Sequence, residues 1–151
     1  MRIRVIGVGT RQGDDAAGLE AAARLAAGPL PPGVEVAACE RPAPDLLEAL
    51  AGADAAVLLD ATRSGRPPGS VRRVAPEEIR RAAALSSHGL GVGDALALCE
   101  ALGRAPRRLV LLGIEAGDAQ GEELSAAVER GVEEAAARVR ALLAELLRDS
   151  A

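Results

Sequence analysis

Two uninterrupted apolar runs, AAVLLDA at 55–61 and LVLLGI at 109–114, most constrain the fold of this chain. A strand with one face in water alternates apolar and polar residues, whereas a strand covered on both faces is apolar along its whole length. Strands of the second kind are typical of parallel sheets that have helices on both sides. The two runs therefore predict the buried centre of a parallel α/β sheet.

Breaks rich in glycine and proline divide the rest of the chain into alternating strands and helices. Further strands are expected at 2–7, 34–39 and, as a short strand or edge, at 71–75. Helices are expected over 15–27, 44–53, 76–85 and 95–103, and as one long helix from about Glu122 onward. This order predicts one domain over 1–151 with an α/β fold, a three-layer sandwich in which helices cover both faces of a mostly parallel, twisted sheet of about five strands.

Composition argues against nucleic acid as a partner. The chain of 151 residues has a formal net charge of -4 and contains no Phe, Tyr or Trp. It therefore offers neither a net positive field for a phosphate backbone nor aromatic rings on which bases stack. Every basic residue is Arg, so no lysine is present for a Schiff base or a P-loop.

The cysteines and the apolar runs indicate the cellular setting. Cys39 and Cys99 belong to no C-x-x-C pair, so both are expected to be small buried hydrophobes. No apolar run approaches about 18–20 residues, and the N-terminus lacks the features of a signal peptide. We therefore expect a cytoplasmic protein that does not engage a membrane. A monomer is expected, because no apolar stripe beyond the core faces is evident.

The turn after the first strand, GVGTRQGDD at 7–15, resembles a phosphate-binding glycine loop but ends in two carboxylates. Its glycine spacing differs from that of dinucleotide-binding loops. Asp14 and Asp15 also stand at the helix N-terminus where a phosphate would bind, and each would oppose it by roughly 1 kcal/mol or more at an effective dielectric constant of about 20. One aspartate is expected to cap the following helix. The other is either a surface charge favoured by the helix dipole or a ligand for a cation.

Two further side chains are expected at the same edge of the sheet, because ligands of such sheets bind beyond the carboxyl ends of the strands. Asp60 closes an apolar run, although it could instead form a turn with Thr62. His88, the only histidine, stands in a glycine-flanked loop, although a lone histidine is often a surface or core residue. Asp15, Asp60 and His88 together would suit a divalent metal such as nickel or zinc, with coordination positions left open for chemistry.

Four ordered motifs along the chain resemble those of the hydrogenase maturation endopeptidases. They are VIGVGTRQGDDAAGL, VLLDATRSG, SSHGLGVGDALAL and LLGIEAGDAQGEELSAAV. The resemblance implies an α/β sandwich and an endopeptidase that removes a C-terminal extension from the large-subunit precursor of a nickel–iron hydrogenase after nickel insertion. It also implies that Asp15, Asp60 and His88 are the catalytic and metal-binding residues, and that the nickel arrives with the precursor.

The opening motif departs from that family in one respect. Its turn is one residue shorter and carries Thr10 where an asparagine is usual, which leaves Asp14 as a second candidate for the acidic ligand. Two other classes of protein stay open on the sequence alone. They are a dinucleotide-binding module and a non-catalytic metal-binding assembly protein on the same fold.

Overall fold

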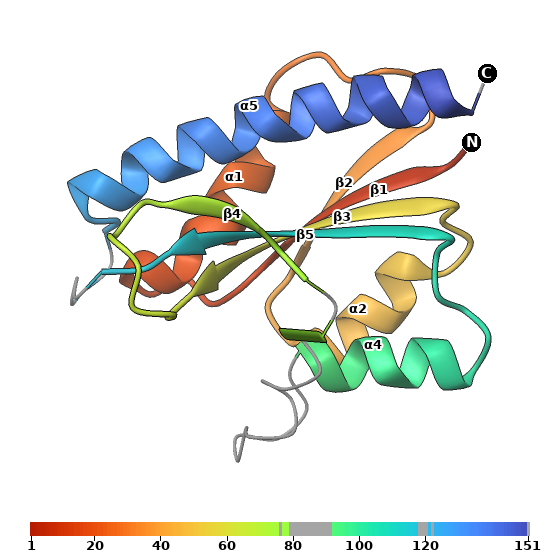
Figure 1. Ribbon diagram of the computed structural model, residues 1–151, viewed down its shortest axis with the longest axis horizontal. Coiled ribbons are helices and arrows are strands. Elements are labelled where there is room, and N and C mark those ends of the chain that lie inside the picture. The colour runs from red at the N-terminus through yellow and green to blue at the C-terminus, as the bar shows by residue number, and fades with distance from the viewer. Residues whose placement is uncertain (76, 79–91, 118–120, 122, 151) are drawn as a thin grey trace.

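The computed structural model describes residues 1–75, 77–78, 92–117, 121 and 123–150, which form a three-layer α/β sandwich (Figure 1). Its strands are β1 (Ile3–Val8), β2 (Val34–Cys39), β3 (Ala55–Thr62), β4 (Val71–Val74) and β5 (Arg108–Glu115). They form one sheet in the order β2-β1-β3-β5-β4. All neighbouring strands pair in parallel except β4, which pairs antiparallel to β5 at the sheet edge. The predicted α/β fold with a mostly parallel sheet is thus confirmed.

Helices cover both faces of this sheet, as Figure 1 shows. They are α1 (Ala17–Ala26) and α5 (Ala126–Asp149) on one face, and α2 (Pro42–Leu50) and α4 (Val92–Ala101) on the other. Each face has its own apolar cluster, one built around α1 and α5 and the other around α2 and α4. In the described part of the chain, no helix is both long and apolar enough to cross a membrane.

The two apolar runs form the middle of the sheet, as predicted. In β3, the five residues from Ala55 to Leu59 are each at most 1% exposed. The register pairs Leu59 with Gly7 on one side and Asp60 with Gly113 on the other. The carboxyl ends of β1, β3 and β5 therefore lie level at one edge, and the chain positions just beyond them are brought together there.

Glycines hold the start of α1 directly against these strand ends. A Cβ atom at Gly18 would lie 2.1 Å from the carbonyl oxygen of Leu59, and one at Gly7 would lie 2.5 Å from the carbonyl oxygen of Gly18. Real Cβ contacts are not that short, so only glycine permits this approach. The close packing fixes the position of the turn that connects β1 to α1.

Several helix boundaries differ from those predicted. The helix expected from residue 15 begins instead as a 3-10 turn, η1 (Gly13–Ala16), before α1. Helices α2 and α4 begin at Pro42 and Val92, earlier than expected, and α5 begins at Ala126 rather than near Glu122. Of the helix expected over 76–85, only residues 77–78 are described, and they are helical.

Both cysteines are buried and free, as expected for small core residues. Cys39 packs in the α2 and α4 cluster at 1% exposure, and Cys99 in the same cluster is fully buried. Burial raises the pKa of the Cys39 thiol to about 11, with a further contribution from the charge of Asp45. The thiol is therefore protonated and poorly reactive at neutral pH.

Candidate active site

The turn after β1 folds back on η1 and holds Asp15 at the carboxyl edge of the sheet. The Thr10 hydroxyl donates a hydrogen bond of 2.6 Å to the Asp15 carboxylate. Gly9 adopts a positive φ of 151°, and a Cβ atom there would lie 2.2 Å from the Asp15 carbonyl oxygen. Gly9 thus permits the turn to pack closely against η1. The acidic residues of η1 lie where a phosphate would bind in a dinucleotide-binding loop.

Asp14, the neighbouring carboxylate, is committed to internal hydrogen bonds. Its side chain is buried, at 1% exposure for the residue. One carboxylate oxygen accepts the N–H of Ser125 at 2.8 Å, and the other accepts the N–H of Gly117 at 2.8 Å and the Ser125 hydroxyl at 3.0 Å. Because both oxygens are engaged, Asp14 links η1 to the start of α5. Asp15 is left as the aspartate of this pair that can meet a ligand.

The expectation that one of these aspartates caps the following helix is wrong. Gln12 and Ala16 occupy the N-cap positions of η1 and α1, and neither makes a side-chain capping bond. Asp14 instead accepts the N–H of Ser125, the N-cap residue of α5. This contact explains why α5 begins after Ser125, since that residue is held in an extended conformation by the bond from η1.

Asp60 lies near the end of β3, where it is partly buried. The pKa of its carboxyl group is raised to about 7, mainly because burial disfavours the charged form. A hydrogen bond from the Ala61 N–H lowers the pKa, and the negative charge of Asp15 raises it. The Asp15 and Asp60 carboxylates are therefore within electrostatic reach of each other. Neither forms an ion pair with an arginine of the described residues.

The turn suggested between Asp60 and Thr62 is replaced by other contacts. Asp60 accepts a hydrogen bond from the backbone of Ala61, and the Thr62 hydroxyl donates to the Glu115 carboxylate at 3.1 Å. The Asp60 side chain is thus not consumed by a local turn with Thr62.

His88, the third residue of the predicted trio, lies outside the described residues. The structure thus brings together Asp15 and Asp60, two of the three. Across the ranges it does describe, no group of three or more His, Cys, Asp and Glu side chains is close enough to hold a metal ion.

Glu115 is a buried carboxylate at this edge that sequence reasoning did not single out. At 3% exposure, it accepts hydrogen bonds from the Ser64 N–H at 2.8 Å and the Ser64 hydroxyl at 2.7 Å, besides that of Thr62. Burial disfavours its charge, but the bonds from Ser64 and Thr62 outweigh that effect and hold its pKa below the ordinary value. The signal in the sequence is the one that marks Asp60, a carboxylic residue that closes an apolar run.

The arrangement of Asp15 and Asp60 suits a cation. Two neighbouring carboxylates repel each other, and a divalent ion between or beside them would relieve that repulsion while using oxygen ligands. A carboxyl group with a pKa near 7 also exchanges a proton readily at neutral pH, as a general acid or base requires. The chemistry of these two carboxylates is thus compatible with a cation ligand and with proton transfer.

Comparison with known proteins identifies the family to which this chain belongs. The family model described as hydrogenase maturation protease, HycI, matches residues 33–142, and the chain belongs to that family. The hydrogenase maturating endopeptidase HybD from E. coli is similar in structure, with a TM-score of 0.84 and 30% identity over 96% of this chain and 93% of that one. The nickel–iron hydrogenase maturation protease HybD from Thermococcus kodakarensis gives a TM-score of 0.72 and 30% identity over 95% and 99% of the two chains.

Two curated proteins are also similar over part of their length. The hydrogenase expression/formation protein HupD of Thiocapsa roseopersicina is 37% identical over 73 residues, which cover 46% of this chain and 33% of that protein. HupM of Azotobacter chroococcum mcd 1, described in the same terms, is 33% identical over 105 residues, 66% of this chain and 50% of that protein. The matched segments thus span half or less of these two relatives.

Proposed function

We propose that this chain is an endopeptidase that removes the C-terminal extension of a nickel–iron hydrogenase large-subunit precursor after nickel has been inserted. The observation that carries the proposal is the pair of carboxylates, Asp15 and Asp60, at the edge where the strands end. Membership of the hydrogenase maturation protease family supports a proteolytic role for this edge.

In this proposal the nickel belongs to the substrate, and Asp15, Asp60 and His88 recognise it. The carboxylates of Asp15 and Asp60 support this role, because they have no basic partner among the described residues and so favour a cation brought by the substrate. Asp14 has no free oxygen and is therefore assigned a structural role. With the nickel of the precursor held by these residues, the site would gain a Lewis acid that can polarise a peptide carbonyl or a water molecule.

The protein residues would orient the metal-bearing segment of the precursor and handle protons. Asp60 is the residue suited to hold and release a proton, because its pKa of about 7 lies at neutral pH. Thr10 would keep the Asp15 carboxylate in a fixed orientation through its hydrogen bond. Cleavage of the peptide bond would then require three parts: a positioned peptide carbonyl, a nearby carboxylate for proton transfer and the polarising ion.

The proposal is tested by incubating the protein with its cognate large-subunit precursor, with and without nickel, and measuring the precursor mass by mass spectrometry. We expect a loss of mass from the C-terminus of the nickel-loaded precursor alone. Asp60→Asn should reduce the cleavage rate at least about a hundredfold, since it removes both a ligand charge and a proton acceptor. Asp54→Asn is the matched control, because Asp54 is exposed just before β3, at the opposite end of that strand.

The two other classes of protein predict different outcomes in the same preparation. A non-catalytic assembly protein would bind the nickel-loaded precursor without any change in precursor mass. A dinucleotide-binding module would bind nicotinamide or flavin nucleotides with micromolar affinity. Either result, together with an intact precursor, would contradict the endopeptidase proposal.

A further inference from the structure

The connection between β3 and β4, residues 63–70, follows the Asp60 strand directly and is held in a fixed shape; we call it the arginine loop. The buried Glu115 side chain binds both the backbone and the hydroxyl of Ser64. Further along, the Gly69 N–H donates to the Glu115 carbonyl at 2.8 Å, and the Glu115 N–H donates to the Ser70 carbonyl at 2.8 Å. Two consecutive prolines between these anchors restrict the backbone further.

Helix α5 packs against the far end of the arginine loop. Gly69 has a φ of 87°, and a Cβ atom there would lie 2.2 Å from the carbonyl oxygen of Ala127. A Cβ atom at Gly131, one helical turn further, would lie 2.5 Å from the carbonyl oxygen of Gly69. The loop is thus fixed between β5 and α5 before any ligand binds, which lowers the entropic cost of binding to it.

Two arginines project from this fixed loop, and their hydrogen-bond partners among the described residues are neutral oxygens. Arg63 donates to the Gly117 carbonyl at 3.3 Å, and Arg66 donates to the Ser64 hydroxyl at 2.9 Å. Both residues are exposed, and neither forms an ion pair with a carboxylate in the described part of the chain. Each guanidinium has five N–H donors in a planar fork that matches a carboxylate. Most of that capacity stays available to a ligand.

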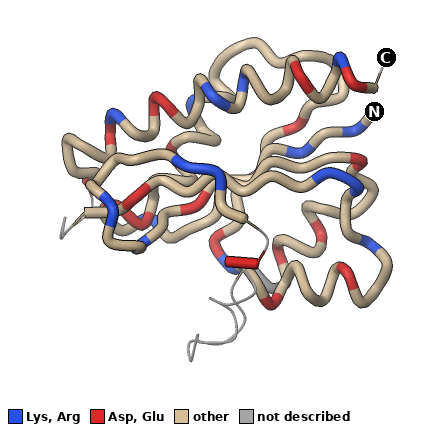
Figure 2. The backbone as a smooth tube through the Cα atoms, viewed as in Figure 1, with Lys and Arg blue, Asp and Glu red and all other residues tan. Residues whose placement is uncertain are grey.

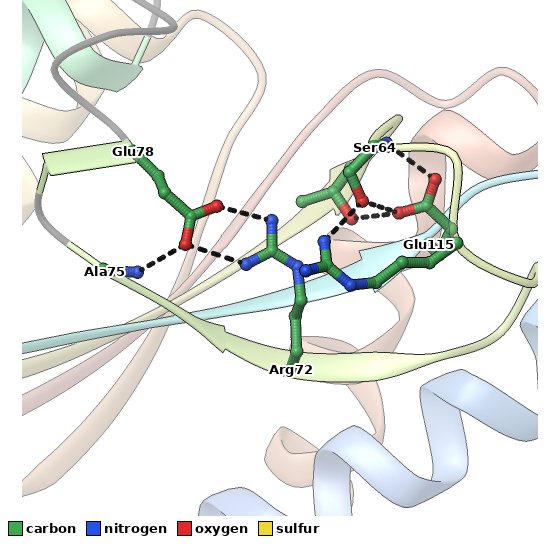
Figure 3. Close-up of polar contacts among 7 residues, drawn as sticks. Ser64, Arg72, Ala75, Glu78 and Glu115 are labelled. Atoms are coloured by element: carbon green, nitrogen blue, oxygen red, sulfur yellow. Dashed lines mark hydrogen bonds and ion pairs between the residues drawn. The ribbon is translucent and has the colours of Figure 1, made fainter.

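The adjacent strand β4 adds to the positive charge, as the blue segment there in Figure 2 shows. Its Arg72 donates two hydrogen bonds, of 3.1 and 2.8 Å, to the Glu78 carboxylate (Figure 3), and its neighbour Arg73 is exposed. The bonds from Arg72 hold the pKa of Glu78 below its ordinary value, with a smaller contribution from the charge of Arg66. Arg66 thus lies within electrostatic reach of this pair.

Charge at this edge is therefore separated into two neighbouring zones. Around the arginine loop and β4, Arg72 is neutralised by its ion pair with Glu78. Within the described residues, Arg63, Arg66 and Arg73 form no ion pair, so their charges stay uncompensated although the whole chain carries a net charge of -4. The carboxylates of Asp15 and Asp60 form the negative zone. Asp60 and Arg63 are three positions apart along the chain, so their Cα atoms lie within about 10 Å of each other. A ligand that crosses the edge meets both zones.

We propose that Arg63 and Arg66 bind acidic side chains of the protein substrate, close to the segment that is cleaved. The inference rests on the proposed function for the identity of the substrate, and it adds how the substrate is oriented. A chain laid across the edge would place a cation against Asp15 and Asp60 and its acidic residues against the arginines, because the opposite orientation sets like charges together. The arginine loop thereby determines which precursors bind.

The binding step is tested without cleavage, by fluorescence anisotropy with a labelled short peptide of alternating Glu and Gly. We expect saturable binding that weakens as salt is added. The double variant Arg63→Gln/Arg66→Gln should bind about tenfold more weakly, the loss expected for two exposed ion pairs. A peptide of alternating Gln and Gly, which has the same shape without charge, should not bind.

The matched control is Arg104→Gln/Arg107→Gln, which removes the same charge from exposed positions ahead of β5, at the opposite end of the sheet. This control should bind the Glu peptide as the unaltered protein does. Equal loss in both double variants would show a general charge effect and would overturn the proposal. Unchanged binding in Arg63→Gln/Arg66→Gln, or binding of the uncharged peptide, would overturn it as well.

Cleavage kinetics separate this inference from the proposed function. With the nickel-loaded precursor, Arg63→Gln/Arg66→Gln should raise KM and leave kcat unchanged, because the arginines bind the substrate away from the reacting bond. If the precursor is never cleaved, the proposed function fails while the peptide result still stands. If cleavage occurs with an unaltered KM in the double variant, the inference fails and the proposed function stands.

Discussion

At the scale of single residues, environment assigns different roles to three aspartates of one chemical type. Asp14 accepts three hydrogen bonds, from Gly117 and Ser125, and is structural. Asp15 accepts one, from Thr10, and keeps capacity for a ligand. Asp60 is desolvated and stands beside Asp15, which makes its charge costly. That cost is typical of a site that a bound cation would relieve.

The cost at Asp60 predicts how stability depends on pH in the absence of substrate. The folded-state pKa is raised from 3.8 to about 7, so between these values the folded protein holds a proton that the unfolded chain has released. The stability of the unaltered protein should therefore fall as pH rises through that window. Asp60→Asn removes the charge and should be more stable by about 1–2 kcal/mol at pH 8, with little difference at pH 4.

Thermal unfolding at a series of pH values checks this prediction. Asp15→Asn should show a smaller gain of the same sign, because only the repulsion is removed. A control variant, Asp54→Asn, should show no such gain as pH rises. A lower melting temperature for Asp60→Asn at pH 8 would contradict the assigned pKa.

These residue roles could be predicted from the sequence only in part. Asp60 could be found because a charged residue that closes an apolar run is unusual at a buried strand end. The role of Asp14 could not, because its partners lie 103 and 111 positions further along the chain. Its neighbour Asp15 is of the same type and differs only in these distant contacts. His88 remains a prediction from the sequence.

At the scale of secondary-structure elements, the contact between α5 and the arginine loop depends on Gly131. An alanine normally stabilises a helix by about 1 kcal/mol relative to glycine. At Gly131 the added Cβ would lie 2.5 Å from the carbonyl oxygen of Gly69 and 2.9 Å from its Cα. Gly131→Ala should therefore destabilise the protein, by about 1–2 kcal/mol, despite the better helix propensity.

Urea unfolding followed by far-ultraviolet circular dichroism measures this effect. Ala137→Gly, at an exposed position of the same helix, is the reference for propensity alone and should cost about 1 kcal/mol. We also expect Gly131→Ala to weaken binding of the Glu peptide, because the arginine loop must shift to admit the methyl group. Increased stability in Gly131→Ala would show that the two elements are not in close contact.

The elements themselves were largely predictable, and their ends were not. Apolar runs identified β3 and β5, because a strand that is buried on both faces is apolar at nearly every position. The start of α5 was placed too early, because the bond from Asp14 to Ser125 acts across the fold and leaves no local signal. The antiparallel direction of β4 also depends on how its connections run rather than on its own residues.

At the scale of the whole molecule, Glu115 joins the arginine loop to a central strand and contributes to stability in a pH-dependent way. Its folded-state pKa lies below the ordinary value of 4.5. Its contribution is therefore fully present above that value and is lost as pH falls through the folded-state pKa. Glu115→Gln should lower the free energy of unfolding by about 1–3 kcal/mol at pH 7. The amide NH2 group would then face the N–H and O–H donors of Ser64 and Thr62 that the carboxylate accepts in the unaltered protein.

Differential scanning calorimetry between pH 7 and pH 3 tests this expectation. The stabilities of Glu115→Gln and of the unaltered protein should converge at the acidic end. Glu123→Gln, an exposed change of the same kind, should follow the unaltered protein throughout. A constant difference at every pH would show that the charge of Glu115 contributes nothing.

The strand order has a consequence for synthesis on the ribosome. β5 is inserted between β3 and β4, although both precede it in the chain. In a nascent polypeptide that ends before Arg108, the edge of β3 that later pairs with β5 is unpaired. Asp14 in that polypeptide also lacks its hydrogen-bond donors, Gly117 and Ser125. The hydrogen bonds that fix Asp14, and with it the acidic turn η1, can therefore form only after Ser125 has emerged from the exit tunnel, when more than four fifths of the chain has been synthesised.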